Sequence, residues 1–161
     1  MPCAYLIITA VALSKIVSGG QTGVDRAALD AARAAGLERG GWCPRGRLAE
    51  DGPLAGAYPL RETPTAEYAQ RTEWNVRDSD ATLILSPLPL DGGTKLTAEI
   101  AKRLRKPWLA LDPRERGALK SAGRWLEETG AETLNVAGPR ASRWAEGYPL
   151  AKSFLAALLT P

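Results

Sequence analysis

The chain contains no histidine among its 161 residues. Histidine is the commonest general base and the commonest metal ligand in proteins, so its absence excludes histidine-dependent catalytic triads and histidine-bearing zinc sites. Any acid–base chemistry must use Asp, Glu, Lys, Tyr or a thiol. Any metal must be held by carboxylates or arrive inside a ligand.

Cysteine, excess charge and long apolar runs are also scarce. Two cysteines, Cys3 and Cys43, lie far apart without a disulfide framework, which predicts a reduced, cytoplasmic setting. The net charge is only +3 and forms no basic tract, so we expect no nucleic-acid partner. The apolar run at residues 6–13 is too short to cross a bilayer and follows no positive charge, so no membrane segment or signal peptide is predicted.

The remaining composition is that of an ordinary globular protein, with 45% hydrophobic and 24% charged residues. Its length suits one compact domain. We therefore predict a single ligand-binding domain over residues 15–161, preceded by an extension of undetermined structure at residues 1–14. The run at residues 6–13 suits either an extra strand or oligomer contact, or an extension produced by a misassigned start codon.

Strand and helix patterns alternate along the chain. The sequence KIVS at residues 15–18 predicts a strand, and apolar spacing after GGQTG predicts a helix that stops at Gly36. Further strands are expected at 40–44, 58–61, 81–86, 108–111 and 134–136, with a long loop at 44–59 and helices at 65–77, 94–104, 117–128 and 150–159. This alternation predicts a Rossmann-like, doubly wound α/β fold with a mainly parallel sheet of five to six strands and helices on both faces.

The loop GGQTG combines three glycines with a helix start. In doubly wound folds ligands bind beyond the carboxyl ends of the strands, where this loop is expected. Backbone amides and the helix dipole favour an anion there, so phosphate is the natural guest. The alternative is a plain tight turn in which Thr22 and Asp25 form a capping box. In the first case Gly20→Val should fill the phosphate space.

A second loop, DGGT at residues 91–94, repeats this arrangement before another helix. Two such helix starts facing one crevice would hold one ligand, although glycine is common in ordinary turns.

Charged residues in two loops add candidates for ligand contact. Arg45 and Arg47 suit phosphate or carboxylate, while Glu50 and Asp51 suit the polar hydrogens of a heterocycle or a cation. Arg140, and Arg143 beside it, could balance negative charge. Solvated surface charge would look the same in every case. Cys43 is expected to be a buried, inert thiol.

Five separated motifs together resemble the molybdenum cofactor carrier family: GGQTGVDRAALDAA, GWCPRGRLAEDG, RTEWNVRDSDATLIL, DGGTKLTAE and NVAGPRAS. The resemblance runs from residue 15 to residue 159. It implies a Rossmann-like, often oligomeric protein that binds molybdopterin carrying molybdenum, or molybdate, without needing a catalytic reaction. Molybdoenzymes would then be acceptors of the cargo.

The resemblance also implies kinship with lysine-decarboxylase-like proteins that hydrolyse nucleoside monophosphates and carry PGGxGTxxE. Here the aligned stretch keeps the double glycine and Glu99, but Asp91, Lys95 and Leu96 replace the Pro, the third Gly and the Thr. This departure favours a non-enzymatic carrier of a phosphate-bearing ligand. The alternatives are a nucleotide N-glycosidase with Glu99 as general acid or base, and a nucleotide-sensing module. The residues expected to contact the ligand are Gly19, Gly20, Gln21, Thr22, Gly23, Asp25, Arg45, Arg47, Glu50, Asp51, Gly92, Gly93, Thr94, Lys95, Glu99 and Arg140.

Overall fold

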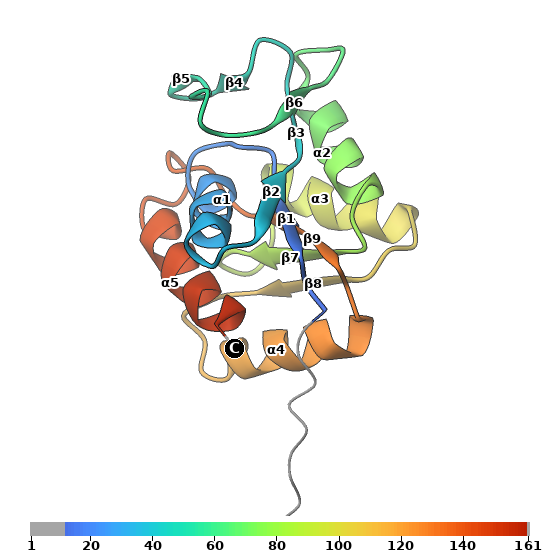
Figure 1. Ribbon diagram of the computed structural model, residues 1–161, viewed down its shortest axis with the longest axis vertical. Helices are drawn as coiled ribbons and strands as arrows, with labels where there is room; N and C mark the ends of the chain where they lie inside the picture. The colour runs from blue at the N-terminus through green and yellow to red at the C-terminus, as the bar shows by residue number, and fades with distance from the viewer. Residues whose placement is uncertain (1–11, 161) are drawn as a thin grey trace, which may run out of the picture.

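A parallel five-stranded sheet organises the chain, whose computed structural model describes residues 12–160. The strand order is β2-β1-β9-β7-β8, seen nearly edge-on in Figure 1. The strands are β1 (Lys15–Val17), β2 (Glu38–Gly40), β7 (Ala81–Leu85), β8 (Trp108–Leu111) and β9 (Thr133–Ala137). The predicted Rossmann-like α/β class with a parallel sheet is confirmed.

Helices α1 and α5 cover one side of this sheet and α2 and α3 the other, while α4 packs beside β8 and α5 (Figure 1). The larger hydrophobic core lies under α1, α4 and α5, where alanines such as Ala27 and Ala31 let the helices approach closely. A smaller cluster of Val76, Ile100 and Ala101 joins α2 to α3. The helices are α1 (Val24–Ala34), α2 (Tyr68–Arg77), α3 (Gly92–Arg103), α4 (Ala118–Thr129) and α5 (Gly147–Leu159).

Every helix expected from the sequence is present, although α2 begins three residues later and α5 three residues earlier than expected. The strand expected at residues 40–44 is present as the short β3 (Trp42–Cys43), outside the five-stranded sheet. The edge strand β2 (Glu38–Gly40) was not predicted, because its charged residues carry no apolar pattern. Helix α2 begins at Tyr68 instead of residue 65. There Thr65 donates both its backbone N–H and its hydroxyl to Oε1 of Gln70, which holds a turn before the helix.

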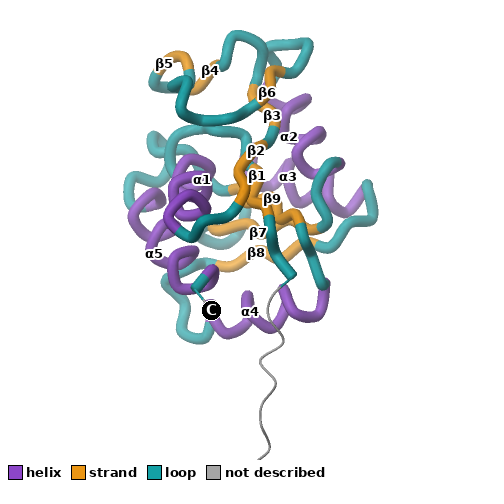
Figure 2. The backbone as a smooth tube through the Cα atoms, viewed as in Figure 1, coloured by secondary structure: helices purple, strands orange, loops and turns teal. Residues whose placement is uncertain are grey.

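The long segment after β2 forms an ordered cap above the sheet (Figure 2). Arg47 organises it by donating to the carbonyl oxygens of four residues of the same segment. Leu54, Leu60 and the free thiol Cys43 are buried against Leu29 of α1, and burial raises the pKa of Cys43. The short strands of this cap are β3 (Trp42–Cys43), β4 (Leu48–Ala49), β5 (Gly52–Pro53) and β6 (Arg61–Glu62).

Three adjacent strands, β1, β9 and β7, end at the same edge of the sheet. The loops that follow them therefore meet, which brings together segments 18–23, 86–91 and 138–146. Within residues 12–160, no helix combines the length and the hydropathy needed to cross a membrane. The apolar run at residues 6–13 lies mostly outside the described residues, although Leu13 packs against the larger core.

Candidate functional site

A cavity of about 230 Å³ opens beyond the carboxyl ends of the central strands. Its wall comes from the loop after β1, one face of α2, the start of α3, and β9 with the loop that follows it. Both predicted glycine loops reach this cavity, through Gly19 and Gln21 on one side and Gly93 and Thr94 on the other. The cavity thus unites segments that are more than seventy residues apart in sequence.

An ion pair between Asp25 and Arg71 forms part of the cavity wall. Arg71 Nη1 lies 3.0 Å from Asp25 Oδ2, and the Asp25 side chain is only 6% exposed. Burial raises the pKa of Asp25, whereas Arg71 and backbone hydrogen bonds from Gln21 and Gly138 lower it. The buried Nε of Arg71 has no hydrogen-bond partner within residues 12–160. The guanidinium therefore retains an unpaired donor beside the cavity.

The amides of the GGQTG loop are largely used by the loop itself. The N–H of Gly20 donates to Ser18 Oγ at 3.3 Å, and that of Thr22 donates to Gln21 Oε1 at 3.0 Å. A backbone hydrogen bond from Gln21 goes to the Asp25 carboxylate. The carboxylate of Asp25 thus occupies the start of α1, where a phosphate of the ligand was expected.

Gly20 faces the core of the cap and not the cavity. A Cβ added there would lie 2.9 Å from both Leu54 and Leu60, and the φ of +73° disfavours any side chain. Gly20→Val would therefore disturb packing, which corrects the expectation that it fills ligand space. The Thr22–Asp25 capping box also does not form, because the N-cap of α1 is Gly23 and no side chain caps it.

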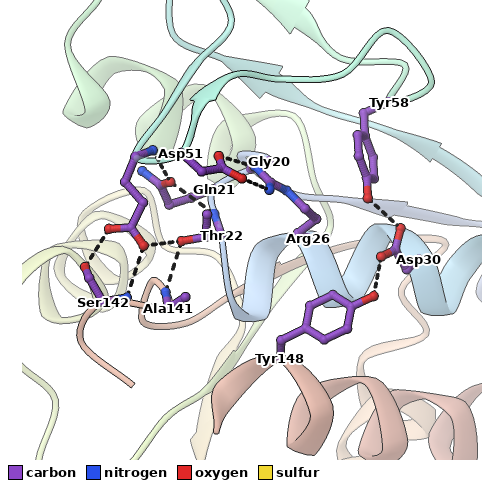
Figure 3. Close-up of polar contacts among 11 residues, drawn as sticks. Gly20, Gln21, Thr22, Arg26, Asp30, Asp51, Tyr58, Ala141, Ser142 and Tyr148 are labelled. Carbon is purple, nitrogen blue, oxygen red and sulfur yellow. Dashed lines mark hydrogen bonds and ion pairs between the residues drawn. The ribbon is translucent and has the colours of Figure 1, made fainter. Parts of the chain in front are cut away.

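A dense hydrogen-bond network around Glu50 joins three loops, and its partners Thr22, Ala141 and Ser142 are labelled in Figure 3. Its carboxylate accepts the hydroxyl of Thr22, and it accepts both the N–H and the hydroxyl of Ser142 at 3.0 and 2.5 Å. Thr22 Oγ1 in turn accepts the N–H of Ala141 at 3.0 Å. The bonds from Ser142 and Thr22 hold the pKa of Glu50 below its usual value. This network fixes the loop after β9 against the loop after β1.

The first turn of α3 lies at the cavity and carries no side-chain cap. The N-cap Asp91 makes no side-chain cap, so the first-turn N–H groups of α3 remain available to a ligand. Gly93 and Thr94 line the cavity. Arg143 Nη2 lies 3.5 Å from Asp91 Oδ2 at the edge of this opening.

The structure brings only part of the predicted set to the cavity. Arg45, Lys95 and Glu99 are exposed and lie outside the cavity wall. Asp51 pairs with Arg26 at 2.5 Å instead. Gly20, Thr22, Gly23, Arg47, Glu50 and Gly92 support the surrounding loops without lining the cavity. The predicted residues that line it are Gly19, Gln21, Asp25, Gly93, Thr94 and Arg140.

One face of α2 supplies cavity residues that the sequence analysis missed. Tyr68, Arg71, Thr72 and Asn75 follow one another at helical spacing and all line the cavity. The guanidinium carbon of Arg71 lies 5.3 Å from the centre of the Tyr68 ring. A polar stripe of this spacing was visible in the sequence, but only the fold shows that it faces a cavity.

Fold and site together define a Rossmann-like protein with a cationic cavity beyond the carboxyl ends of its central strands. The chain belongs to the circularly permutated YpsA SLOG family, which matches residues 16–159. It is also similar to the crystal structure of a putative molybdenum carrier protein from Syntrophus aciditrophicus SB. That similarity has 44% identity and a TM-score of 0.88 and covers 92% of this chain and 96% of the other. No curated protein matches the chain. The predicted relationship to molybdenum carriers is confirmed.

Proposed function

We propose that the protein is a non-enzymatic carrier that binds molybdate, or the molybdenum cofactor, through its oxyanion groups. One observation carries this proposal: Arg71, Arg140 and Arg143 converge with the uncapped start of α3 on a single cavity. Guanidinium groups and free amides are donors suited to phosphate and related oxyanions. The name of the 44% identical relative supports the same cargo.

The residues of the cavity fit such a cargo. Its volume of about 230 Å³ is smaller than the roughly 300–1,000 Å³ of pockets that enclose a whole drug-sized ligand. It would therefore enclose molybdate, or the oxyanion end of a larger cofactor whose remainder lies at the opening. Within the described residues no cluster of three or more His, Cys, Asp or Glu side chains could hold a metal ion. We therefore expect molybdenum to be held through the oxygens or the organic part of the cargo.

The structure gives less support to the N-glycosidase alternative. Its proposed acid or base, Glu99, is exposed on α3 and outside the cavity wall. We accordingly expect no release of ribose phosphate from nucleoside monophosphates. As part of the carrier proposal we also expect a cytoplasmic homo-oligomer that delivers its cargo to molybdoenzymes.

Equilibrium dialysis against sodium molybdate, with molybdenum measured by mass spectrometry, tests the proposal. A parallel arm uses molybdenum cofactor released from a molybdoenzyme and detects its pterin by fluorescence. We expect uptake of at least one probe by the wild type. Arg143→Gln should weaken that uptake about five- to tenfold, because a charge-assisted contact at an exposed opening contributes about 1 kcal/mol.

Arg124→Gln serves as the matched control, since Arg124 is exposed on α4 and outside the cavity wall. It removes the same charge and should leave uptake unchanged. Failure of the wild type to bind either probe would overturn the proposal, as would turnover of a nucleoside monophosphate.

A further inference from the structure

Gln21 carries a side-chain donor whose direction is set by the protein. The residue lines the cavity and is 6% exposed. Its Oε1 accepts the N–H of Thr22 at 3.0 Å and the N–H of Glu50 at 2.8 Å. Exchanging the amide oxygen and nitrogen would place Nε2 against two donors, so the orientation follows from the network. Nε2 is left without a hydrogen-bond partner in the part of the chain that the structure describes.

Thr94 carries a second unpaired group on the wall of the same cavity. It lines the cavity at the first turn of α3 and is 6% exposed. Its hydroxyl forms no hydrogen bond within residues 12–160. The hydroxyl of Thr97, one turn further along, instead donates to the carbonyl oxygen of Gly93 at 2.9 Å. Only the threonine nearer the helix start keeps its hydroxyl free.

Neither atom is among the fully buried side-chain atoms that lack a partner, so both remain accessible although their residues are only 6% exposed and line the cavity. Two unpaired polar groups on the wall of one cavity are therefore placed to meet a bound ligand. Both can donate, as can the arginines and the amides of α3 around them. The two carboxylates of the wall, Asp25 and Asp91, each pair with an arginine, so these unpaired donors suit a ligand that presents oxygen acceptors.

We propose that Gln21 Nε2 and Thr94 Oγ1 donate hydrogen bonds directly to oxygens of the bound oxyanion. The inference rests on the proposed carrier function and assigns two uncharged side chains to the recognition of its cargo. Gln21 acts here through its side chain, whereas the GGQTG motif suggested a role for backbone amides. The arginines attract the anion by charge, and the side chains of Gln21 and Thr94 donate hydrogen bonds to its oxygens.

Gln21→Glu is the sharpest test, because one carboxylate oxygen can keep the two bonds to Thr22 and Glu50. The other carboxylate oxygen then takes the place of Nε2, so that a charged acceptor faces the cavity instead of a donor. We expect molybdate and cofactor binding to weaken at least about tenfold, since a charged group would face the anion without a hydrogen bond.

Gln70→Glu is the matched control for this substitution. Gln70 Oε1 also accepts two donors, the N–H and the hydroxyl of Thr65, but the residue lies outside the cavity wall. Binding by this variant should equal that of the wild type. Equal binding by Gln21→Glu, with the fold intact by circular dichroism, would overturn the assignment.

Thr94→Val supplies an independent arm if Gln21→Glu does not fold. Valine preserves the shape of threonine and removes only the free hydroxyl, so the melting temperature should stay the same or rise. Binding should weaken about threefold or more, as expected for one lost hydrogen bond. Thr63→Val should lower the melting temperature and leave binding unchanged. The buried Thr63 hydroxyl donates to Thr65 O at 2.9 Å, and Thr63 lies outside the cavity wall.

The outcomes separate this inference from the proposed function. If the wild type binds neither probe, both fail. If the wild type binds and the Gln21 and Thr94 variants bind equally well, the carrier function stands and the assignment of these donors is wrong. A lower melting temperature for Thr94→Val without weaker binding would also contradict it, because the hydroxyl would then be structural.

Discussion

The guanidinium of Arg71 occupies the space above Gly19. A Cβ built on Gly19 would lie 1.5 Å from Arg71 Nη1, although Arg71 comes from a helix that begins 49 residues later. The first glycine of GGQTG is therefore required by an internal arginine and not by an approaching ligand. Through this contact the loop after β1 holds a cation in place beside the cavity.

Gly19→Ala should displace this guanidinium from Asp25. The collision involves the end of a flexible side chain, so we expect the fold to persist with the free energy of unfolding lowered by about 1–3 kcal/mol. Urea unfolding measures the loss. Gly123→Ala, in α4, is the control, because an added Cβ there meets nothing within 4 Å and should stabilise by about 0.5–1 kcal/mol. An unchanged stability of Gly19→Ala would contradict the close contact between Gly19 and Arg71.

Removing Arg71 should be costly because it leaves a buried carboxylate without its partner. Arg71→Met is expected to lower the free energy of unfolding by about 3–5 kcal/mol. Adding Asp25→Asn to this variant should restore part of the loss, since the uncompensated charge is gone. A double-mutant cycle in urea measures this coupling, and additive single effects would show that the two residues act independently.

Acid should weaken the network around Glu50. Hydrogen bonds from Ser142 and Thr22 lower the pKa of Glu50 in the folded protein, so its stabilisation is present above the ordinary glutamate value of 4.5. It is lost as the pH falls through the lower folded value, because the unfolded chain binds the proton first. Glu50→Gln should reduce stability at pH 7 and flatten its decline in acid. Exposed Glu128→Gln, on α4, controls for the lost charge, and an unchanged acid profile for Glu50→Gln would refute the prediction.

Alkali should weaken the contact between Asp30 of α1 and two tyrosines. Tyr58 and Tyr148 both donate their hydroxyls to Asp30, at 2.9 and 2.5 Å, as Figure 3 shows. Burial, followed by the bond to Asp30, raises the pKa of Tyr148 from 10.0 to about 12. The corresponding stabilisation is present below pH 10 and lost as the pH rises toward 12.

Ultraviolet titration of tyrosinate at 295 nm tests this shift. The wild type should show a tyrosine that ionises near pH 12, and Tyr148→Phe should remove that contribution. If the titration of Tyr148→Phe keeps the same late step, the assignment to Tyr148 is wrong.

The order of elements could be predicted because it depends on local patterns. Apolar spacing in the alanine-rich helix and the continuous apolar strand at 81–85 report which face of each element is buried. Their alternation leads to a parallel sheet, and adjacent strand ends then bring the GGQTG and DGGT loops to one side. The charged edge strand β2 escaped prediction since it buries too little apolar surface to leave a pattern.

The roles of individual polar residues depended on the tertiary structure. Arg47 and Asp51 have the chemistry of phosphate or cation ligands, yet their partners are backbone carbonyls of the cap and Arg26. Arg71 was not among the residues expected to contact the ligand, yet it pairs with Asp25 across 46 residues.

The sequence by itself therefore determined the sheet-and-helix scaffold, the end of the sheet where loops gather and the family. Only the tertiary structure decided which charges face the cavity and which hold the loops. The physical reason is range: periodicity and turn preferences act over a few residues, whereas Glu50 meets Ser142 across 92 residues. A polar side chain takes its role from the distant segment that the fold places opposite it.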